Sequence, residues 1–324
     1  MGGIFTISLD FELHWGVFDK KDRLDRTGCY QHTIRLIPEV LRLFEKYEVN
    51  ATWATVGGVF ANDRNEWERL KPSILPQYTL EKYSAYKWVE KHDLPEHLYF
   101  AHFAPQVVDN ILKYPGQELG THTFGHYYCL EEQPGFDAFD ADLKAAKKAA
   151  MKFNNTPVSL VFPRNQFNEE CLKICFANEI KVIRSNPNSW FWTPVPDSRP
   201  QILRKIYRTG DAYIPLGKRT SYPLKAIEIK QNEPIQLPAS RLLRPWHNKY
   251  QLANKLSLQR VLKEIKTAAI QKECYHLWWH PENFGDHPEE NLRNLNLILQ
   301  EYKNCKLKFG MTSWNMGEYA KHLL

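Results

Sequence analysis

The sequence predicts a single α/β domain built around a mostly parallel sheet. Apolar runs of strand length alternate along the chain with segments of helical periodicity, as in proteins whose parallel strands are joined by helices. Acidic, histidine and arginine residues stand at or just after the ends of several apolar runs, and in this class of fold that edge of the sheet carries the active site. Because no repeat, low-complexity tract or linker divides the 324 residues, one domain spanning residues 1–324 is expected.

The first half of the chain contains three expected strands and two expected helices. The strands are residues 4–12, 51–58 and 117–122, and the helices are residues 33–49, which include Pro38, and 105–114. The first apolar run ends in acidic residues, which is typical of a buried strand that reaches a functional edge. Residues 60–105 fit no regular repeat and are rich in Trp, Tyr, Lys and Pro, so they are expected to form an insertion.

The second half of the chain continues the alternation and contains a second irregular segment. The expected helices are residues 135–153, 168–178, 258–271, 289–304 and 316–323, and the expected strands are residues 157–165, 180–185, 274–280 and 307–314. Nine prolines punctuate residues 186–250, since proline interrupts both helices and central strands. This segment is therefore expected to be a second long insertion, with room for a β-hairpin.

The charge balance bears on the partners. The chain carries 43 Lys and Arg against 37 Asp and Glu, which gives a net charge of +6. Such an excess suits an anionic substrate or peripheral contact with an anionic membrane surface. No nucleic-acid partner is expected, because no dense basic block is interleaved with aromatic residues.

The sequence also favours a cytoplasmic location. It opens directly on a strand-like run without the features of a secretory signal. No segment approaches the roughly 20 apolar residues of a membrane-spanning helix. The six cysteines include no CxxC pair, so they are expected to be reduced thiols.

Asp10 and Glu12 close the first expected strand. Residues two apart on a strand project from the same face, so both carboxylates would point to one side. Two buried charges need compensation, which favours a functional role. The alternative is that Glu12 lies past the strand and is simply solvated.

His122 and His126 follow the third expected strand in the segment HTFGH. If this segment forms a helical turn, the two rings lie on one side of it, an arrangement common among zinc ligands. Packing is the more frequent explanation of an isolated HxxxH pattern. The position at a strand end, together with a nearby carboxylate, instead indicates a catalytic metal site with two histidines and one acid.

Two further groups of residues stand at strand ends. Arg164 follows the run VFP and is either a surface residue or the partner of a carboxylate in the site. In YHLWWHP, His280 precedes a proline and fits a general acid or base, whereas His276 is deeper and is expected to be structural. Trp278 shares their strand face and either walls an apolar pocket or belongs to the core.

This set of residues resembles the polysaccharide deacetylase family, the carbohydrate esterases that remove acetyl groups from N-acetylated sugars. The resemblance runs from Ser8 to Trp314, with the motifs in the family's order. SLDFE resembles the opening acidic motif, HTFGH the metal-binding motif, RNQF the R-x-P-Y motif, and WWH the L-x-H motif. The third match is partial, because Gln166 replaces the proline. The family implies a distorted (β/α) barrel of about seven repeats, here with the two long insertions.

The resemblance also implies roles for individual residues. Glu12, His122 and His126 would hold a divalent metal, most simply zinc, and Asp10 would be the general base. Arg164 would orient Asp10, and His280 would be the general acid. Phe167 would supply a backbone N–H to the oxyanion, and Trp278 would contact the acetyl methyl. Arg241 is a candidate for substrate contact, together with Arg244 and Trp246.

The expected function is metal-dependent removal of an acetyl group from an N-acetylated sugar. With a cytoplasmic location, the substrate would be a precursor of a surface polysaccharide or lipopolysaccharide, carried on phosphate or linked to lipid. Two alternatives stay open. The protein could hydrolyse another non-peptide amide, such as a cyclic amide or ureide, or it could be a non-catalytic sugar-binding protein on the same fold. The oligomeric state and the identity of the sugar are not predicted.

Overall fold

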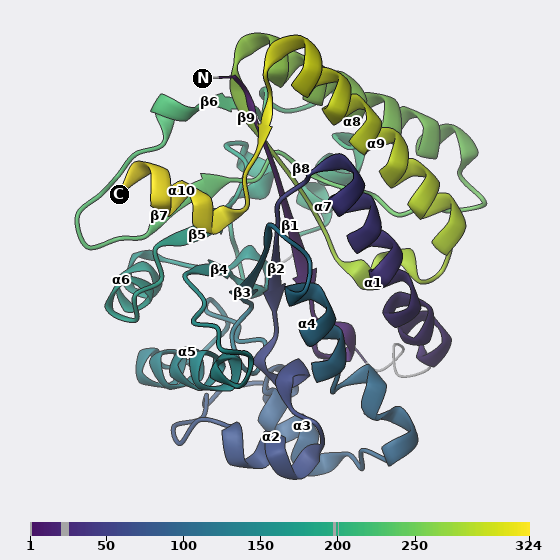
Figure 1. Ribbon diagram of the computed structural model, residues 1–324. Helices are drawn as coiled ribbons and strands as arrows, with labels where there is room; N and C mark the ends of the chain where they lie inside the picture. Colours follow the sequence, from purple (N-terminus) through teal and green to yellow (C-terminus); the bar gives the residue numbers. More distant parts are fainter. Residues whose placement is uncertain (1, 21–25, 197–198, 200) are drawn as a thin grey trace.

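A curled, mostly parallel sheet forms the centre of the molecule (Figure 1). The computed structural model describes residues 2–20, 26–196, 199 and 201–324. Along the sheet the strands follow the order β6-β9-β1-β2-β3-β4-β5-β7, with β10 beside β1 and β8 beside β9. Among the strands of the described residues, only β6 runs antiparallel to its neighbour. The strands are β1 (Ile4–Phe11), β2 (Ala51–Thr55), β3 (Gln117–Thr121), β4 (Ser159–Val161), β5 (Val182–Ser185), β6 (Tyr222–Pro223), β7 (Ile235–Pro238), β8 (Arg241–Leu242), β9 (Glu273–Trp279) and β10 (Thr312–Ser313).

One continuous segment joins the two ends of this sheet. Residues 235–238 form β7 and pair with β5, while residues 241–242 form β8 and pair with β9. Between them, the Ala239 N–H donates to Ser185 O and the Ser240 N–H donates to His276 O. The sheet is therefore curled into the distorted barrel that the family resemblance implied, and the predicted fold class is confirmed.

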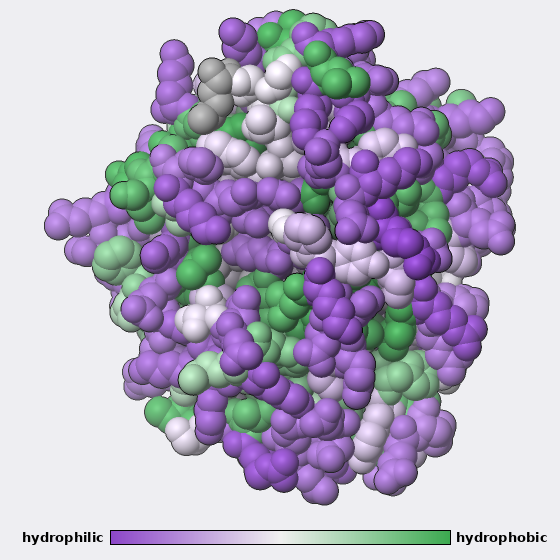
Figure 2. All heavy atoms as spheres, in the orientation of Figure 1, coloured by the Kyte–Doolittle hydropathy of each residue, from purple (hydrophilic) through white to green (hydrophobic). Residues whose placement is uncertain are grey.

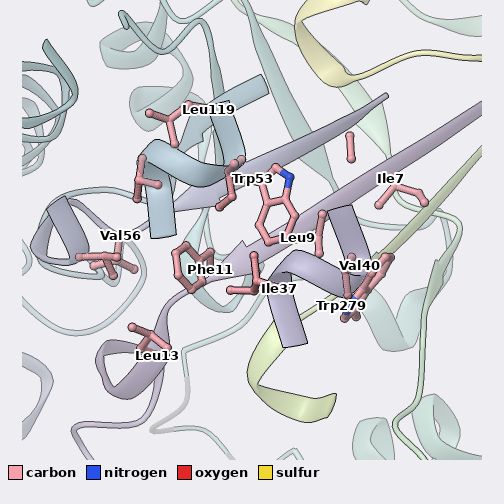
Figure 3. Close-up of a cluster of buried hydrophobic side chains, with 14 of the residues drawn as sticks. Ile7, Leu9, Phe11, Leu13, Ile37, Val40, Trp53, Val56, Leu119 and Trp279 are labelled. Carbon is pink, nitrogen blue, oxygen red and sulfur yellow. The ribbon is translucent and has the colours of Figure 1, made fainter. Parts of the chain in front are cut away.

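Alternation along β1 separates the outer core from the barrel interior. Ile7, Leu9 and Phe11 point outward, where Figure 3 shows them beside Ile37 and Val40 of the first helix. Thr6, Ser8 and Asp10 occupy the alternate positions, and all are buried although they are polar. The interior of the barrel is thus built for polar contacts and the outside for helix packing.

Helices cover the outside of the barrel, and α1, α9 and α8 lie side by side in Figure 1. Pro38 lies within the 21-residue helix α1. The covering helices are α1 (Thr27–Tyr47), α4 (Pro105–Leu112), α5 (Phe136–Ala150), α6 (Glu169–Ala177), α8 (Gln251–Gln271), α9 (Pro288–Phe309) and α10 (Met316–Leu323).

The two irregular segments differ from the prediction in one respect. Residues 60–105 form short helices, α2 (Arg64–Leu70) and α3 (Ala85–Lys91), with 3-10 turns around them. Residues 186–250 contain α7 (Ile202–Gly210), but β7 and β8 within this range belong to the barrel and form no separate hairpin. Pro238 is the last residue of β7, a position where the missing N–H disturbs the ladder least.

A second difference concerns the end of the chain. The strand predicted over residues 307–314 shrinks to β10, because α9 continues to Phe309 and ends at Gly310, whose φ is +68°. A glycine adopts this left-handed conformation without steric cost and commonly ends a helix.

The surface in Figure 2 is mostly hydrophilic, with hydrophobic residues in separate groups. None of the helices in the described parts of the chain is long and apolar enough to cross a membrane.

A buried histidine pair connects the loop after β1 with the first insertion. His102 Nε2 lies 3.0 Å from His14 Nδ1, and His102 Nδ1 contacts Leu98 O at 3.2 Å. Burial lowers the pKa of His102 to about 4, although the Leu98 carbonyl opposes the shift. Burial, with His102 and His92 nearby, lowers the pKa of His14 to about 3. Both rings are therefore neutral in the folded protein at neutral pH.

We expect this pair to make the protein acid-sensitive. An unfolded histidine titrates near pH 6.5, so the contribution of neutral His102 is complete above that pH and is lost as the pH falls toward 4. The difference corresponds to about 3 kcal/mol. Chemical denaturation at pH 7 and pH 4.5 should show a smaller loss of stability for His102→Gln than for the wild type. The exposed His97→Gln should keep the wild-type loss, and equal losses in all three proteins would contradict the assignment.

Candidate metal and catalytic site

A polar cavity opens at the carboxyl ends of the barrel strands. Its volume is about 470 Å³, and residues that directly follow or end β1, β4 and β9 line it. Asp10 and Glu12 come from the end of β1, Arg164 follows β4, and Trp278 and His280 come from the end of β9. Parallel strands bring their carboxyl ends to one rim, so these residues meet although they are far apart in the sequence.

The three predicted metal ligands lie together. Glu12 Oε1 is 2.8 Å from His122 Nε2 and 3.3 Å from His126 Nε2. All three side chains are buried, and one potential ligand atom of each lies within 4.8 Å of the others. Glu12 follows the end of β1, but it is not solvated as the alternative supposed. Gly16 makes room for it, because an added Cβ would stand 1.7 Å from Glu12 Oε2.

The hydrogen bonding of His122 tests whether this group fits a metal ion. His122 Nδ1 is buried and has no hydrogen-bond partner among the described residues, and the buried Nε2 lies beside Glu12 Oε1, the other candidate ligand atom. An unpartnered buried nitrogen is costly in a structural histidine, whereas a metal ligand needs its lone pair free. Two imidazoles and one carboxylate are also a typical catalytic zinc donor set, so these residues fit a divalent metal such as zinc.

The protonation states of the ligands agree with this assignment. Burial opposes the ionisation of Glu12, but His280, His126 and His122 outweigh it and hold the pKa of Glu12 well below its usual range. Burial lowers the pKa of His126, and the nearby Glu12 carboxylate only partly offsets this effect. The site therefore presents a charged carboxylate and a neutral imidazole near neutral pH, which are the forms that bind metals.

A buried carboxylate shapes the histidine segment. The segment after β3 is a loop and not the predicted helical turn. Asp142 of α5 accepts hydrogen bonds from Phe124 N at 2.6 Å, Gly125 N at 3.1 Å and the Tyr86 hydroxyl at 2.5 Å. Gly125 is needed because an added Cβ would lie 2.7 Å from the Tyr86 oxygen. The loop thus depends on backbone amides bound by Asp142, which the HxxxH spacing did not reveal.

Two more residues orient the ligands. The Tyr128 hydroxyl lies 3.1 Å from His126 Nδ1 and so fixes the orientation of that ring. Glu282 accepts hydrogen bonds from the backbone N–H groups of Glu12, at 3.0 Å, and Leu13. Burial, with the charge of Glu12, raises the pKa of Glu282 to about 8. Neither residue was predicted, although Glu282 stands two positions after His280 in the motif.

Asp10 pairs with Arg184 and not with Arg164. Arg184 Nη1 donates to Asp10 Oδ1 at 2.6 Å and Nη2 donates to Oδ2 at 2.7 Å, and both side chains are buried. Arg184 lies on β5, within a strand that is otherwise mostly apolar. A charge at such a position requires a partner, and this signal could have identified it from the sequence.

The predicted role of Arg164 in orienting Asp10 is therefore wrong. Its backbone after β4 is left-handed, with φ 54° and ψ 15°. The Arg164 side chain forms an ion pair with Asp19, and its guanidinium carbon lies 4.1 Å from the centre of the Tyr128 ring. Arg164 still lines the cavity.

His280 occupies the position expected of a proton-transfer group. Its Nε2 is 3.7 Å from Asp10 Oδ2 and 3.6 Å from Glu12 Oε1, and its side chain is 29% exposed. Trp278 lines the cavity, and its ring centre is 4.1 Å from the Arg184 guanidinium carbon. His276, by contrast, is buried, with Nε2 2.8 Å from Ser8 Oγ.

Two of the candidate substrate contacts lie elsewhere. Phe167 packs on Phe162, with ring centres 5.0 Å apart, and does not line the cavity, whereas the neighbouring Asn165 and Gln166 do. Arg241 is buried in ion pairs with Glu264 and Asp211, so it does not face the cavity. These two carboxylates balance its charge within the protein, and one of them, Glu264, lies on α8.

Of the other two candidates, Arg244 lines the cavity. Trp246 does not, and its ring N–H donates to Asn248 at 2.7 Å.

Comparison with known proteins gives the fold. No protein-family model and no curated protein sequence matches the chain. Among solved structures, a candidate polysaccharide deacetylase from Mycobacterium smegmatis aligns with a TM-score of 0.61 and 12% identity, over 100% of this chain and 91% of that one. A GH57-type branching enzyme from Pyrococcus horikoshii aligns at 0.54 and 11% identity, over 100% and 71%. An allantoinase aligns at 0.55 and 9% identity, over 98% and 88%. The predicted resemblance to polysaccharide deacetylases is thus confirmed at the level of the fold.

We expect Arg184→Met to destabilise the protein by about 3–5 kcal/mol, because it leaves the Asp10 carboxylate buried without its partner. Chemical denaturation would measure the loss. Adding Asp10→Asn to this variant should recover part of it, since the uncompensated charge is removed. Arg219→Met is the control, because that arginine pairs with Glu273 from an exposed position and should cost about 1 kcal/mol or less. A double variant no more stable than Arg184→Met would contradict a dominant role for the ion pair.

We expect the protein to bind one zinc ion per chain through Glu12, His122 and His126. Titration of metal-free protein, followed by calorimetry, should show that Glu12→Gln or His122→Ala weakens binding by about 100-fold or more. Tyr128→Phe should weaken it by about 10–100-fold, because it frees the His126 ring. The exposed His97→Gln should bind as the wild type does. Unchanged affinity in the Glu12 and His122 variants would place the metal elsewhere.

Proposed function

We propose that the protein is a metal-dependent hydrolase that removes the acetyl group from an N-acetylated sugar. The observation that carries this proposal is the convergence of three metal-type ligands, a second carboxylate and a partly exposed histidine at one rim of the cavity. Glu12, His122 and His126 would hold a divalent metal, most simply zinc. When bound, this ion would supply a Lewis acid that polarises a carbonyl group and acidifies water.

Asp10 is the proposed general base. Its carboxylate borders the cavity beside Glu12, and Arg184 fixes its orientation through two hydrogen bonds. A base acts only if it reaches the proton that it removes, and this clamp keeps Asp10 directed at the rim where water and the acetamide would meet. Because Glu12 serves as a ligand, Asp10 is left to accept the proton of the attacking water.

His280 is the proposed general acid. It stands between the two carboxylates and the cavity, so it can carry a proton to the departing amine nitrogen. Trp278 is proposed to form an apolar wall for the acetyl methyl group. The cavity volume of about 470 Å³ suits one or two sugar units, and Trp192 provides a second aromatic surface in its lining.

The proposed substrate is a cytoplasmic precursor of a surface polysaccharide or lipopolysaccharide. All six cysteines are free and buried, which suits a reducing compartment. Several cationic side chains in the cavity lining would favour a substrate that carries negative charge.

The main alternative is hydrolysis of a cyclic amide or ureide. The similar fold of an allantoinase supports this alternative. A non-catalytic sugar-binding role is less well supported, since such a protein has no need for a base, an acid and three metal-type ligands in one cavity. Assays of acetate release and of allantoin hydrolysis on the same preparation would separate these functions.

We expect zinc-loaded protein to release acetate from N-acetylated sugars, and chelated protein to lose this activity. Asp10→Asn and His280→Asn should each lower kcat by about 10²–10⁴-fold, because each removes one proton-transfer group. Their zinc affinity should stay close to that of the wild type, which separates proton transfer from metal binding. Acetate release that survives both chelation and Asp10→Asn would overturn the proposal.

A further inference from the structure

The helix α7 turns its apolar face outward. Ile202, Leu203 and Ile206 are 71%, 64% and 59% exposed, and no residue of this helix is buried. A surface helix of a soluble protein normally packs its apolar face on the core. Here that face is left without a partner among the described residues, although the helix is strongly amphipathic.

The polar side of α7 is the side that holds it to the protein. Arg204 Nη1 donates to Trp190 O at 2.9 Å and to Thr193 O at 2.8 Å. Arg208 Nε donates to Phe191 O at 2.6 Å. Rolling the apolar face inward would break these contacts, so the outward orientation is fixed by the basic residues.

Neighbouring residues extend the apolar face. The Trp190 ring centre lies 5.0 Å from that of Tyr207, and Leu216 lies against Gly210 at the end of the helix. All of these large side chains are exposed. We call the resulting surface the α7 patch, which comprises Trp190, Ile202, Leu203, Ile206, Tyr207 and Leu216.

The same helix contributes cations to the cavity. Lys205 and Arg208 line it, together with Arg244 from the segment after β8. The Arg244 Nε is buried and has no hydrogen-bond partner among the described residues. No carboxylate in the described parts of the chain pairs with these three side chains. Burial lowers the pKa of both Arg208 and Arg244, as expected for cations that lack a counter-charge.

The α7 patch on the surface and the three cations in the cavity match the two parts of a lipid-linked sugar phosphate. Its apolar chains would stay in a membrane, and its phosphate would enter the cavity, where arginine binds such groups well. Amphipathic elements with aromatic and basic residues also bind the surface of anionic membranes. The net charge of +6 adds attraction to such a surface.

We propose that the α7 patch docks on the surface of an anionic lipid bilayer, and that the cavity takes an N-acetylated sugar joined through phosphate to a lipid of that bilayer. The substrate part of this inference rests on the proposed deacetylase function, whereas the docking part does not. Lys205, Arg208 and Arg244 bind the phosphate, while the apolar face of α7 enters the headgroup region.

Vesicle flotation tests the docking directly. The purified full chain is mixed with vesicles of phosphatidylcholine alone, or of phosphatidylcholine with phosphatidylglycerol. The test variant is Ile202→Ser/Leu203→Ser/Ile206→Ser. The control is Met151→Ser/Leu252→Ser/Leu307→Ser, whose three positions are 65%, 71% and 75% exposed on other helices or turns. Denaturation and zinc titration establish that both variants are folded.

The wild type and the control should float with the anionic vesicles, and added salt should weaken this binding. The test variant should bind at least about tenfold more weakly. A wild type that stays unbound, or a test variant that floats like the wild type, overturns the proposal. Conversion of a dimer to a monomer by the test variant, with flotation unchanged, would assign the patch to a second copy of the chain.

A second arm tests the substrate class. An N-acetylated sugar joined through phosphate to a lipid is supplied in vesicles, and the corresponding free sugar phosphate is supplied in solution. The α7 variant should lower acetate release from the vesicle substrate by about tenfold or more and leave release from the soluble one within about twofold. Equal effects on both substrates would overturn the proposal. Glu12→Gln should abolish acetate release from both while flotation persists, so failure of the deacetylase proposal would be seen separately.

Discussion

The buried ion pair between Asp10 and Arg184 is the constraint around which the site is built. It joins β1 to β5 across the barrel interior, where the Arg184 side chain is fully buried and Asp10 keeps only a small exposure, at the cavity. A buried charge without its partner is costly, so the two strands must keep their register for the pair to form. The same guanidinium also donates to Ser8 and stacks on Trp278 of β9, which ties a third strand into the arrangement. Alignment of the Asp10 carboxylate therefore comes from the barrel strands themselves.

Around this pair, the ligand group depends on less regular structure. Glu12 leaves β1 with its backbone N–H bound by Glu282, and the histidine loop takes its shape from Asp142. Each of these supporting carboxylates is buried, and burial raises the pKa of Asp142 to about 6. A dense set of acids and imidazoles thus shares one low-dielectric region, in which small changes in packing alter several protonation states together.

The sequence predicts the helices and strands that have strong local signals. It does not predict side-chain and strand pairings that depend on contacts between distant residues. Asp10, Glu12 and His280 could be placed at one rim, because strand ends and their polar residues are visible in the pattern. The family motif assigned Arg164 to Asp10, whereas the structure pairs Asp10 with Arg184, whose charge within the buried strand β5 was the signal to follow. Arg241 looked available in a proline-rich segment, but it pairs with Asp211 of the same segment and with Glu264 of α8, neither of which is its neighbour in the sequence. Pairing of residues 235–242 with both β5 and β9 likewise follows from tertiary structure alone.

The closure of the barrel by a single segment has a consequence for how the protein can diverge. Residues 186–234 leave from the end of β5 and return at β7, which pairs with β5 again, so the start and finish of this excursion are held side by side. Within it, β6 pairs with β9, but the described residues among 186–221 contribute no strand to the sheet, so their length and sequence can change without removing a barrel strand. The residues around the cavity mouth can then change during evolution, while the buried residues on the barrel strands stay the same.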